Sequence, residues 1–260
     1  MTRDSVNQLV LAYAANRRIG VRCLELLLAR GLSPKILLVP PLEESETARE
    51  IVTMVPGTPV LQGREFRGQS GISVLSSLSL DFMISIHFPY VFPREVLAIP
   101  RQGTLNLHPA YLPFNRGWHT ATWAILDKTQ FGVTLHWVDE GLDTGDIALQ
   151  ESLAIEPDDT ADSLYRKALD LEVVVFEKAI PMLMSGTLPR IPQGKHSTFH
   201  RRRDIEGVRD LTKQGAVAPA ELVRVLRALT TNVATEAAYL REDGKKLLLR
   251  LDIKADLEDG

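Results

Sequence analysis

Residues 103–148 read GTLNLHPAYLPFNRGWHTATWAILDKTQFGVTLHWVDEGLDTGDIA, and the interpretation of the whole chain depends on this stretch. It predicts a strand ending in Asn-Leu-His, a proline-punctuated loop, a helix, a second strand and an acidic loop. Polar and apolar residues alternate from Thr104 to His108. Asn106 and His108 are therefore expected on one face at the end of their strand.

These two side chains together suit proton transfer at a carbonyl centre. An Asn amide donates to an oxygen that gains negative charge, and an imidazole takes or relays a proton near neutral pH. Asp143 is the preferred carboxylate partner for the imidazole, because it lies at the loop tip between Gly141 and Gly145. The other carboxylates of this loop are Asp139, Glu140 and Asp146.

Two other interpretations of this stretch stay open on the residues alone. Asn-x-His pairs also occur with structural roles, and Asp residues commonly form turns. Four of the side chains are also possible metal ligands: His108, His119, His136 and Asp143. Their spacing matches no common zinc pattern and no thiolate accompanies them, so no metal site is predicted.

Upstream of this stretch, short apolar segments alternate with helical ones. Strands are expected within residues 6–15, 34–41, 58–62 and 81–87, and helices over 19–30 and 43–54, with loop and short helix over 64–79. This order predicts an α/β fold, a Rossmann-like, mostly parallel sheet with helices on both faces. Ligands of such sheets bind beyond the carboxyl ends of the strands. Residues 13–18 lack Gly-x-Gly-x-x-Gly, so no dinucleotide site is predicted.

Downstream, a long helix is expected over residues 159–185, followed by a change in composition. Residues 186–194 carry prolines and glycines, and the basic run KHSTFHRRR follows at 195–203. We therefore expect a domain over 1–194 and a small α+β extension over 195–260. The extension should contain a helix at 219–229 and a hairpin of 237–240 with 246–253 around Asp243-Gly244. So small a hairpin must pack on the main domain or on a second subunit.

Composition limits the class of protein. The chain has 260 residues, of which 45% are hydrophobic and 24% charged, with a net charge of -3 and a pI near 6.1. This net charge is small and negative, so the chain as a whole does not attract nucleic acid or an anionic membrane electrostatically. The lone Cys23 allows no internal disulfide, which fits a cytoplasmic location. No apolar run reaches the length of a membrane span, and the first residues lack a signal pattern.

The ordered motifs resemble the folate-dependent formyltransferases, the superfamily that contains methionyl-tRNA formyltransferase and glycinamide ribonucleotide formyltransferase. The resemblance covers roughly residues 5–190. It is carried by Asn106-Leu107-His108, Leu112-Pro113, Arg116-Gly117, Gly132-Val133-Thr134 and the sequence DEGLDTGD at 139–146. The joint occurrence of these motifs in this order is far more specific than any one of them.

The resemblance implies 10-formyltetrahydrofolate as formyl donor and an amine as acceptor. It makes Asn106, His108 and Asp143 the catalytic residues. Asn106 and protonated His108 would stabilise the tetrahedral oxyanion, while Asp143 orients His108 and helps to move the proton to the departing folate nitrogen. The pterin is expected between two loops, largely against backbone groups of Phe88, Pro89, Tyr90, Val91, Val138, Asp139 and Gly141.

Within that family, residues 112–119 are most similar to the sugar N-formyltransferases of lipopolysaccharide O-antigen biosynthesis. The expected acceptor is thus a dTDP- or GDP-linked amino sugar, and the expected assembly is a homodimer built by the C-terminal extension. Asn115, Arg116 and Trp118 are the expected substrate contacts, Arg116 because a guanidinium fork fits phosphate oxygens.

The alternatives are a methionyl-tRNA formyltransferase-like enzyme, a non-catalytic folate- or nucleotide-sugar-binding protein, and hydrolysis with water as acceptor. Against the tRNA enzyme, the roughly 65 residues after the expected boundary are too few for a large C-terminal domain.

Overall fold

The structure, a computed structural model, describes residues 9–213 and 215–254. The chain divides into two compact units. The first unit comprises Met1–His108, Leu135–Leu149 and Glu172–Pro192, and the second comprises Pro109–Thr134, Gln150–Leu171 and Gln193–Gly260. Both units are discontinuous in sequence, and the expected division into a domain over 1–194 and a C-terminal extension over 195–260 stays a prediction.

Five parallel strands form the body of the first unit: β1 (Leu11–Ala15), β2 (Ile36–Val39), β3 (Val60–Gln62), β4 (Phe82–Ile86) and β5 (Gly103–His108). Their sheet continues through β7 (Phe131–Trp137) and β8 (Ile147–Leu153), in the order β3-β2-β1-β4-β5-β7-β8. The pairs β2–β3, β1–β2, β1–β4 and β4–β5 are parallel. Strand order reverses between β1 and β4, as in Rossmann-like sheets, and the predicted α/β class is confirmed.

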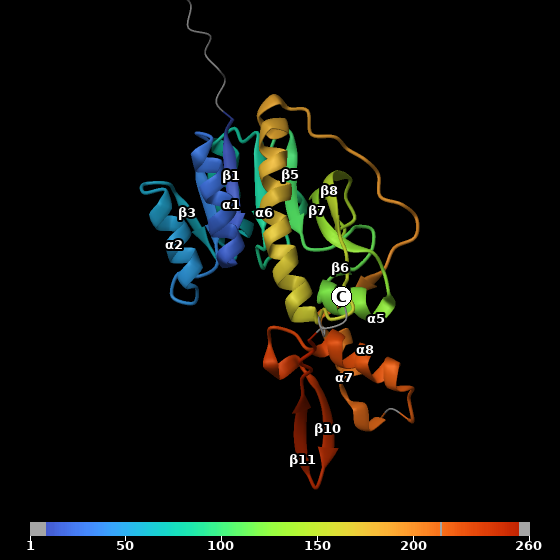
Figure 1. Cartoon of the computed structure of the whole chain (residues 1–260). Helices are drawn as coiled ribbons and strands as arrows, with labels where there is room; N and C mark the ends of the chain where they lie inside the picture. The colour runs from blue at the N-terminus through green and yellow to red at the C-terminus, as the bar shows by residue number, and fades with distance from the viewer. Residues whose placement is uncertain (1–8, 214, 255–260) are drawn as a thin grey trace, which may run out of the picture. The chain divides into compact units, whose positions relative to one another are not determined.

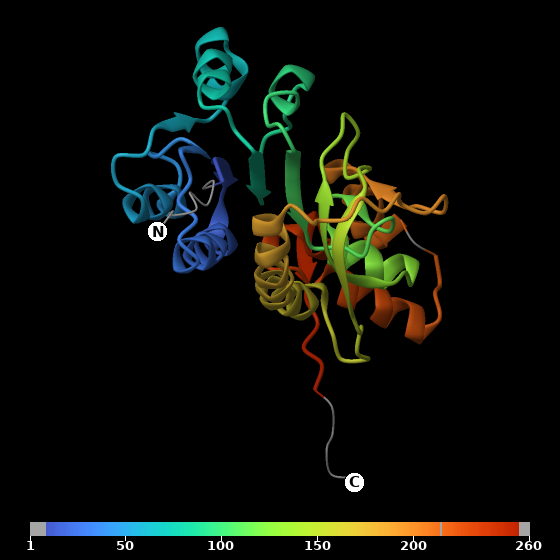
Figure 2. The ribbon, with the colours of Figure 1, turned by 90° about the horizontal axis from the view of Figure 1, so that it is seen from above.

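Helices cover both faces of these strands. Figure 2 shows α1 (Arg17–Ala29) on one side and α3 (Gln69–Ser77) with α4 (Arg94–Leu97) on the other. Helix α2 (Glu46–Met54) packs beside α1 and begins at Ser45, whose hydroxyl accepts from the Ala48 N–H at 3.1 Å. A short 3-10 turn, η1 (Glu65–Arg67), precedes α3.

The core on the α3 side of the sheet combines strand, helix and loop residues. Its fully buried members come from β1, β2, β4, η1, α3 and α4, and Phe88 and Tyr90 of the loop after β4 pack against it. Strands buried on both faces need apolar residues at every position. That explains why the segments LAYAA, ILLV and FMISI are continuous rather than alternating.

The second unit joins the helix α5 (Thr120–Asp127) to most of the C-terminal chain (Figure 1). Its further elements are β6 (Arg116–Gly117), β9 (Phe199–His200), η2 (Arg202–Ile205), α7 (Glu206–Arg209), η3 (Leu211–Lys213), α8 (Pro219–Leu229), η4 (Ala234–Glu236), β10 (Ala238–Glu242) and β11 (Lys245–Leu249). Ile205, Leu211, Val225, Leu229 and Ala238 form its core. The predicted helix 219–229 and terminal hairpin are confirmed.

The hairpin turn has the geometry expected from its residues. Asp243 and Gly244 both have positive φ, 47° and 73°, which a two-residue turn of this twist requires. Strands β10 and β11 are antiparallel, with Leu240 opposite Leu247. Of the predicted first strand, residues 6–8 lie outside the described chain. None of the helices in the described residues is long and apolar enough to span a membrane.

Helix α6 (Ala161–Ser185) begins in the second unit beside a buried carboxylate. Asp159, 2% exposed, accepts from Ser163 Oγ at 2.7 Å, the Glu156 N–H at 2.9 Å and Lys167 Nζ at 2.8 Å. Burial would raise the pKa of Asp159, but the hydrogen bonds from Lys167, Ser163 and Glu156 outweigh it and hold the pKa below its ordinary value. The guanidinium of Arg227 on α8 donates to the backbone carbonyls of Asp159 and Glu156, so the segment just before α6 is bonded to α8.

Replacing Asp159 with Asn is expected to lower the free energy of unfolding at pH 7 by about 1–3 kcal/mol, because an amide NH2 opposes donors that a carboxylate accepts. The folded-state pKa lies below the ordinary value of about 3.9, so the contribution is present above that pH and is lost as the pH falls through the folded-state pKa. Urea denaturation from pH 7 down to about pH 2 measures the gap between the two proteins, which should narrow below about pH 3.9. The exposed neighbour Asp158→Asn is the control, and a pH-independent gap would contradict the assignment.

Candidate active site

Two neighbouring strands of the sheet bring an amide and two imidazoles close together. Asn106 and His108 lie at the carboxyl end of β5, and His136 lies at the end of β7, the next strand in the sheet. His108 is 8% and His136 2% exposed. All three belong to the first unit, so a short stretch of two strands holds them rigidly.

The Asp143 carboxylate faces both imidazoles. Its Oδ2 lies 3.7 Å from His108 Nε2, and its Oδ1 lies 3.5 Å from His136 Nε2. The two rings are nearly perpendicular, at 89°, with centroids 6.2 Å apart. One carboxylate therefore lies within 4 Å of both imidazoles.

His136 orients the Asn106 amide. Its Nδ1 lies 2.8 Å from the Trp137 carbonyl oxygen, which can only accept, so Nδ1 carries a proton. In the neutral ring Nε2 then accepts from Asn106 Nδ2 at 3.2 Å. One amide hydrogen is used in this bond, and the second remains to donate elsewhere. The arrangement directs the NH2 side of Asn106 toward His136.

The acidic loop is shaped by its own backbone and side chains. Asp139 Oδ1 accepts from the Gly141 N–H at 3.0 Å and from Thr144 Oγ1 at 2.6 Å, a turn typical of Asp. The Val138 N–H donates to the Thr104 carbonyl at 2.8 Å. Asp143, at φ 55°, is left-handed, and this turns its carboxylate toward His108. The sequence analysis considered that the Asp residues serve only to form turns. In this loop Asp139 is the residue that does so.

Gly145 allows the loop to close against β7. A Cβ at this position would lie 2.0 Å from the Trp137 carbonyl oxygen and 2.8 Å from its carbon. No side chain fits there without moving backbone. Since Asp143 is two residues away, the position of its carboxylate depends on this contact.

The two loops expected to hold the pterin both belong to the first unit. Phe88 stacks on Phe92 at 5.4 Å and 15°, and meets Tyr90 edge-on at 5.2 Å. Arg67 donates to the Val91 carbonyl at 2.6 Å. Pro89 is exposed. An exposed ion pair of 3.1 Å links Arg94, the first residue of α4, to Glu140 in the acidic loop.

Each of these loops also presents an apolar side chain to solvent. Val91 is 65% and Leu142 40% exposed. The N–H groups of Val138 and Gly141 are already bonded within the chain. The ligand contacts expected of Phe88, Pro89, Tyr90, Val91, Val138, Asp139 and Gly141 stay predictions.

The three predicted substrate residues lie in the second unit. Asn115 is 1% exposed; its Nδ2 donates to Thr129 Oγ1 at 2.8 Å, and its N–H donates to Thr198 Oγ1 at 2.7 Å. The Arg116 guanidinium donates through Nε and Nη2 to Gln193 Oε1, at 3.1 and 2.6 Å. These bonds give Asn115 and Arg116 structural roles, and their substrate contacts stay predictions.

Trp118 presents its ring at the surface of the second unit. It is 43% exposed, and the guanidinium carbon of Arg202 lies 5.3 Å from its ring centroid. Nearby, the His200 and Trp123 rings stack at 3.8 Å and 4°, and His200 Nε2 lies 2.9 Å from Asp127 Oδ2. Trp118 thus has the exposed face that ligand stacking needs, whereas Trp123 is a core residue.

His136 has a site position that the sequence analysis did not assign. We considered it only as a possible metal ligand. The signal was present, because Thr134-Leu135-His136 continues the polar–apolar alternation of β7. Among residues 9–213 and 215–254, no group of three or more His, Cys, Asp or Glu is arranged to hold a metal ion.

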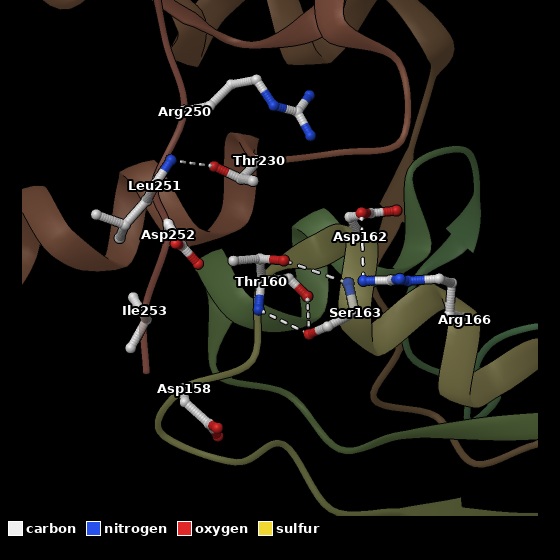
Figure 3. A pocket seen from close by; sticks show the side chains of 10 residues that line it. All are labelled: Asp158, Thr160, Asp162, Ser163, Arg166, Thr230, Arg250, Leu251, Asp252 and Ile253. Carbon is white, nitrogen blue, oxygen red and sulfur yellow. Dashed lines mark hydrogen bonds and ion pairs between the residues drawn. The ribbon is translucent and has the colours of Figure 1, made fainter. Parts of the chain in front are cut away.

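A cavity of about 380 Å³ in the second unit contains none of the predicted site residues (Figure 3). Its polar groups bond among themselves. Ser163 and Thr160 exchange hydrogen bonds at 3.0 and 3.2 Å, Arg166 pairs with Asp162, and the Leu251 N–H donates to Thr230 Oγ1. These contacts lie at the start of α6 and in the C-terminal chain. We therefore assign the cavity a structural role and not a ligand-binding one.

Comparison with known proteins gives one family match, in which the model of the formyl transferase family matches residues 40–180. The chain is 29% identical over 203 residues to a methionyl-tRNA formyltransferase of Geobacter metallireducens, covering 77% of this chain and 63% of that protein. It is 28% identical over 178 residues to a dTDP-4-amino-4,6-dideoxyglucose formyltransferase of Mycobacterium bovis, covering 68% and 74%.

Among solved structures, a sugar N-formyltransferase of a Shewanella species has a TM-score of 0.82 at 18% identity, over 96% of this chain and 100% of that one. At that identity the likeness concerns the fold. The chain spans between 49% and 65% of the length of the first curated relatives that it matches.

Replacing Gly145 with Ala is expected to lower the free energy of unfolding by about 1–3 kcal/mol and to displace Asp143 from His108, because the new Cβ collides with backbone. Thermal unfolding and a structure of the variant measure both effects. Gly207→Ala is the matched control, since a Cβ there meets nothing within 4 Å, and a change within about 0.5 kcal/mol is expected. Equal stability of the two variants would contradict the role of the close contact.

Proposed function

Because the chain belongs to the formyl transferase family, we propose that it is a folate-dependent N-formyltransferase. It would transfer the formyl group of 10-formyltetrahydrofolate to the amine of a nucleotide-linked amino sugar. The observation that carries the proposal is the convergence of Asn106, His108 and Asp143 at the carboxyl end of β5, with Asp143 3.7 Å from His108.

The arrangement suits acyl transfer to an amine. Asn106 donates an amide N–H to the formyl oxygen as negative charge develops on it, and His136 holds that amide in position. Protonated His108 stabilises the same oxyanion, and the Asp143 carboxylate keeps the imidazole charged and oriented. As the bond from the amine nitrogen to the formyl carbon forms and the bond to folate N10 breaks, His108 and Asp143 pass the proton of the new ammonium to N10.

The loops 88–91 and 138–143 are the proposed donor site. A flat heterocycle needs an apolar slot with few polar groups. Val91 and Leu142 offer exposed apolar side chains on the two loops, and an ion pair links Glu140 of the second loop to Arg94 at the start of α4. 10-Formyltetrahydrofolate supplies the formyl carbon as a co-substrate.

An amino sugar is the proposed acceptor for two reasons. The relative named as a dTDP-4-amino-4,6-dideoxyglucose formyltransferase is matched over 74% of its own length. In the second unit, exposed Trp118 offers a stacking face, and Arg116 is the proposed phosphate contact. Asn115 would shape this loop. We place the reaction in the cytoplasm, in the biosynthesis of lipopolysaccharide O-antigen.

Transfer to methionyl-tRNA is the second candidate, since the first curated relatives are methionyl-tRNA formyltransferases. A tRNA-binding protein needs a strong basic face, whereas this chain carries a net charge of -3. Retention on tRNA that falls steeply with added salt would support this candidate over the amino sugar.

Replacing His108 with Asn, or Asp143 with Ala, is expected to lower kcat by about 10²–10⁴-fold with the fold intact, because each change removes proton transfer from the reacting centre. The assay incubates the protein with 10-formyltetrahydrofolate and dTDP- and GDP-linked 3-amino and 4-amino sugars, and mass spectrometry detects the added formyl group. His196→Asn, at an exposed position, is the matched control.

Near wild-type rates in the His108 and Asp143 variants would overturn the catalytic assignment. Folate turnover without formylation of any sugar would favour another amine, or hydrolysis. No folate turnover in the wild type would favour a non-catalytic folate- or nucleotide-sugar-binding protein.

The β10–β11 hairpin is the proposed homodimer contact. Leu240, Leu247 and Leu248 are 37%, 40% and 46% exposed, an unusual density of apolar surface for one short hairpin. Tyr239, 7% exposed, anchors the hairpin to its own unit, and three cations lie over its ring: Arg209, Arg241 and Lys246.

Changing the cross-strand pair Leu240 and Leu247 to Asp together is expected to convert dimers to monomers, because two carboxylates cannot be buried at an apolar contact. Light scattering after size exclusion measures the mass. Lys245→Asp at the hairpin tip makes the same change of two charge units and should leave the dimer intact. A double variant that remains dimeric would place the interface elsewhere.

A further inference from the structure

A buried side-chain hydrogen bond lies next to the loop proposed to hold the donor. His87 follows β4, and its Nε2 lies 2.8 Å from Oε1 of Glu172 on α6, 85 residues away in the chain. The side chains are 8% and 0% exposed. Both residues belong to the first unit. Neither has a part in the proton transfer proposed for Asn106, His108 and Asp143.

The backbone is constrained at His87 and at the residue before it. Its φ of 49° is left-handed, a conformation that non-glycine residues seldom adopt. The carbonyl just before it, that of Ile86, accepts from the Asn16 N–H at 3.1 Å. The residue just after it is Phe88, the first of the aromatic loop. His87 therefore sets the direction in which the chain leaves β4.

Stability alone does not account for the pair. Glu172 Oε2 is buried and accepts no hydrogen bond from the described residues. Cys23 on α1 faces the same carboxylate: burial first, and then the Glu172 charge, raise the pKa of its thiol. Replacing both partners of a buried polar contact with apolar groups of similar shape is often neutral or stabilising. Such a pair is therefore better explained by the conformation that it specifies.

The segment that the pair constrains is the aromatic loop. Phe88 stacks on Phe92 and packs with Tyr90 against Phe66. A different direction at residue 87 would move Phe88 out of this cluster and carry Tyr90 and Val91 with it. Strained backbone held by surrounding structure is commonly found at ligand-binding loops.

We propose that His87 and Glu172 are a positioning pair, whose hydrogen bond holds loop 88–91 in the conformation that binds the folate donor. This inference rests on the proposed function, because it takes that loop as part of the donor site. The pair contacts neither the reacting atoms nor the acceptor. Breaking it should weaken donor binding and leave the chemical step unchanged.

The test measures tetrahydrofolate binding by isothermal titration calorimetry, so it needs neither turnover nor a known acceptor. Glu172→Leu removes the hydrogen bond and is expected to raise the Kd by about tenfold, the equivalent of one lost hydrogen bond. Glu172→Gln keeps an acceptor of the same shape and should stay within about threefold of the wild type. Rescue by this conservative variant separates positioning from a general loss of packing.

His87→Gly is a second way to break the pair, useful if Glu172→Leu does not fold. Glycine accepts the left-handed backbone and removes the imidazole, so the expected loss of affinity is again about tenfold. In kinetic assays the donor KM should rise by the same factor, with kcat and the amino-sugar KM unchanged. Asp159→Asn, a buried carboxylate of the second unit, is the matched control and should not change donor affinity.

The outcomes separate this inference from the proposed function. Failure of the wild type to bind tetrahydrofolate would overturn both. Binding by the wild type with unchanged affinity in Glu172→Leu and His87→Gly would overturn the positioning pair alone. Equal weakening by Glu172→Leu and Glu172→Gln would also overturn it, because the charge and not the hydrogen bond would then be responsible.

Discussion

The site depends on one carboxylate placed between two imidazoles. Asp143 must come within 3.7 Å of His108 and 3.5 Å of His136, which lie on different strands. That requires β5 and β7 to be neighbours, a left-handed residue at position 143, and a loop closed tightly enough to exclude any side chain at Gly145. The surrounding sheet thus fixes the positions of two neighbouring strands and of the tight loop that carries Asp143.

Buried charge has different consequences in the two units. In the second, Asp159 is satisfied by three donors and stabilises the start of α6. In the first, Glu172 has one partner, His87, and one oxygen that accepts no hydrogen bond from the described chain. A fully hydrogen-bonded carboxylate stabilises the fold, whereas a partly bonded one costs free energy, and we attribute the retention of Glu172 to the loop conformation proposed above.

The sequence predicted secondary structure correctly where local hydrophobic periodicity and turn-forming residues determine it. The continuous apolar runs predicted β1, β2 and β4, and Asp243-Gly244 predicted the hairpin turn. Strand β8 was not predicted, since its residues IALQESL are mostly half-buried and alternate weakly. Asn115, proposed from the motif as a substrate contact, is bonded to Thr129 and Thr198, and no pattern in the sequence indicates those partners.

By itself the sequence determined the fold class, the family resemblance and the short list of polar residues at the end of one strand. These follow from local pattern and motif order, which a single chain displays. Tertiary structure decided which residues meet: that His136 orients Asn106, that Asp143 faces both imidazoles, and that His87 finds Glu172. The reason is physical, because hydrogen bonds and ion pairs act over a few ångströms. Asn106 and His136 are 30 residues apart and His87 and Glu172 are 85 apart, so these partners come within that range only when the sheet assembles.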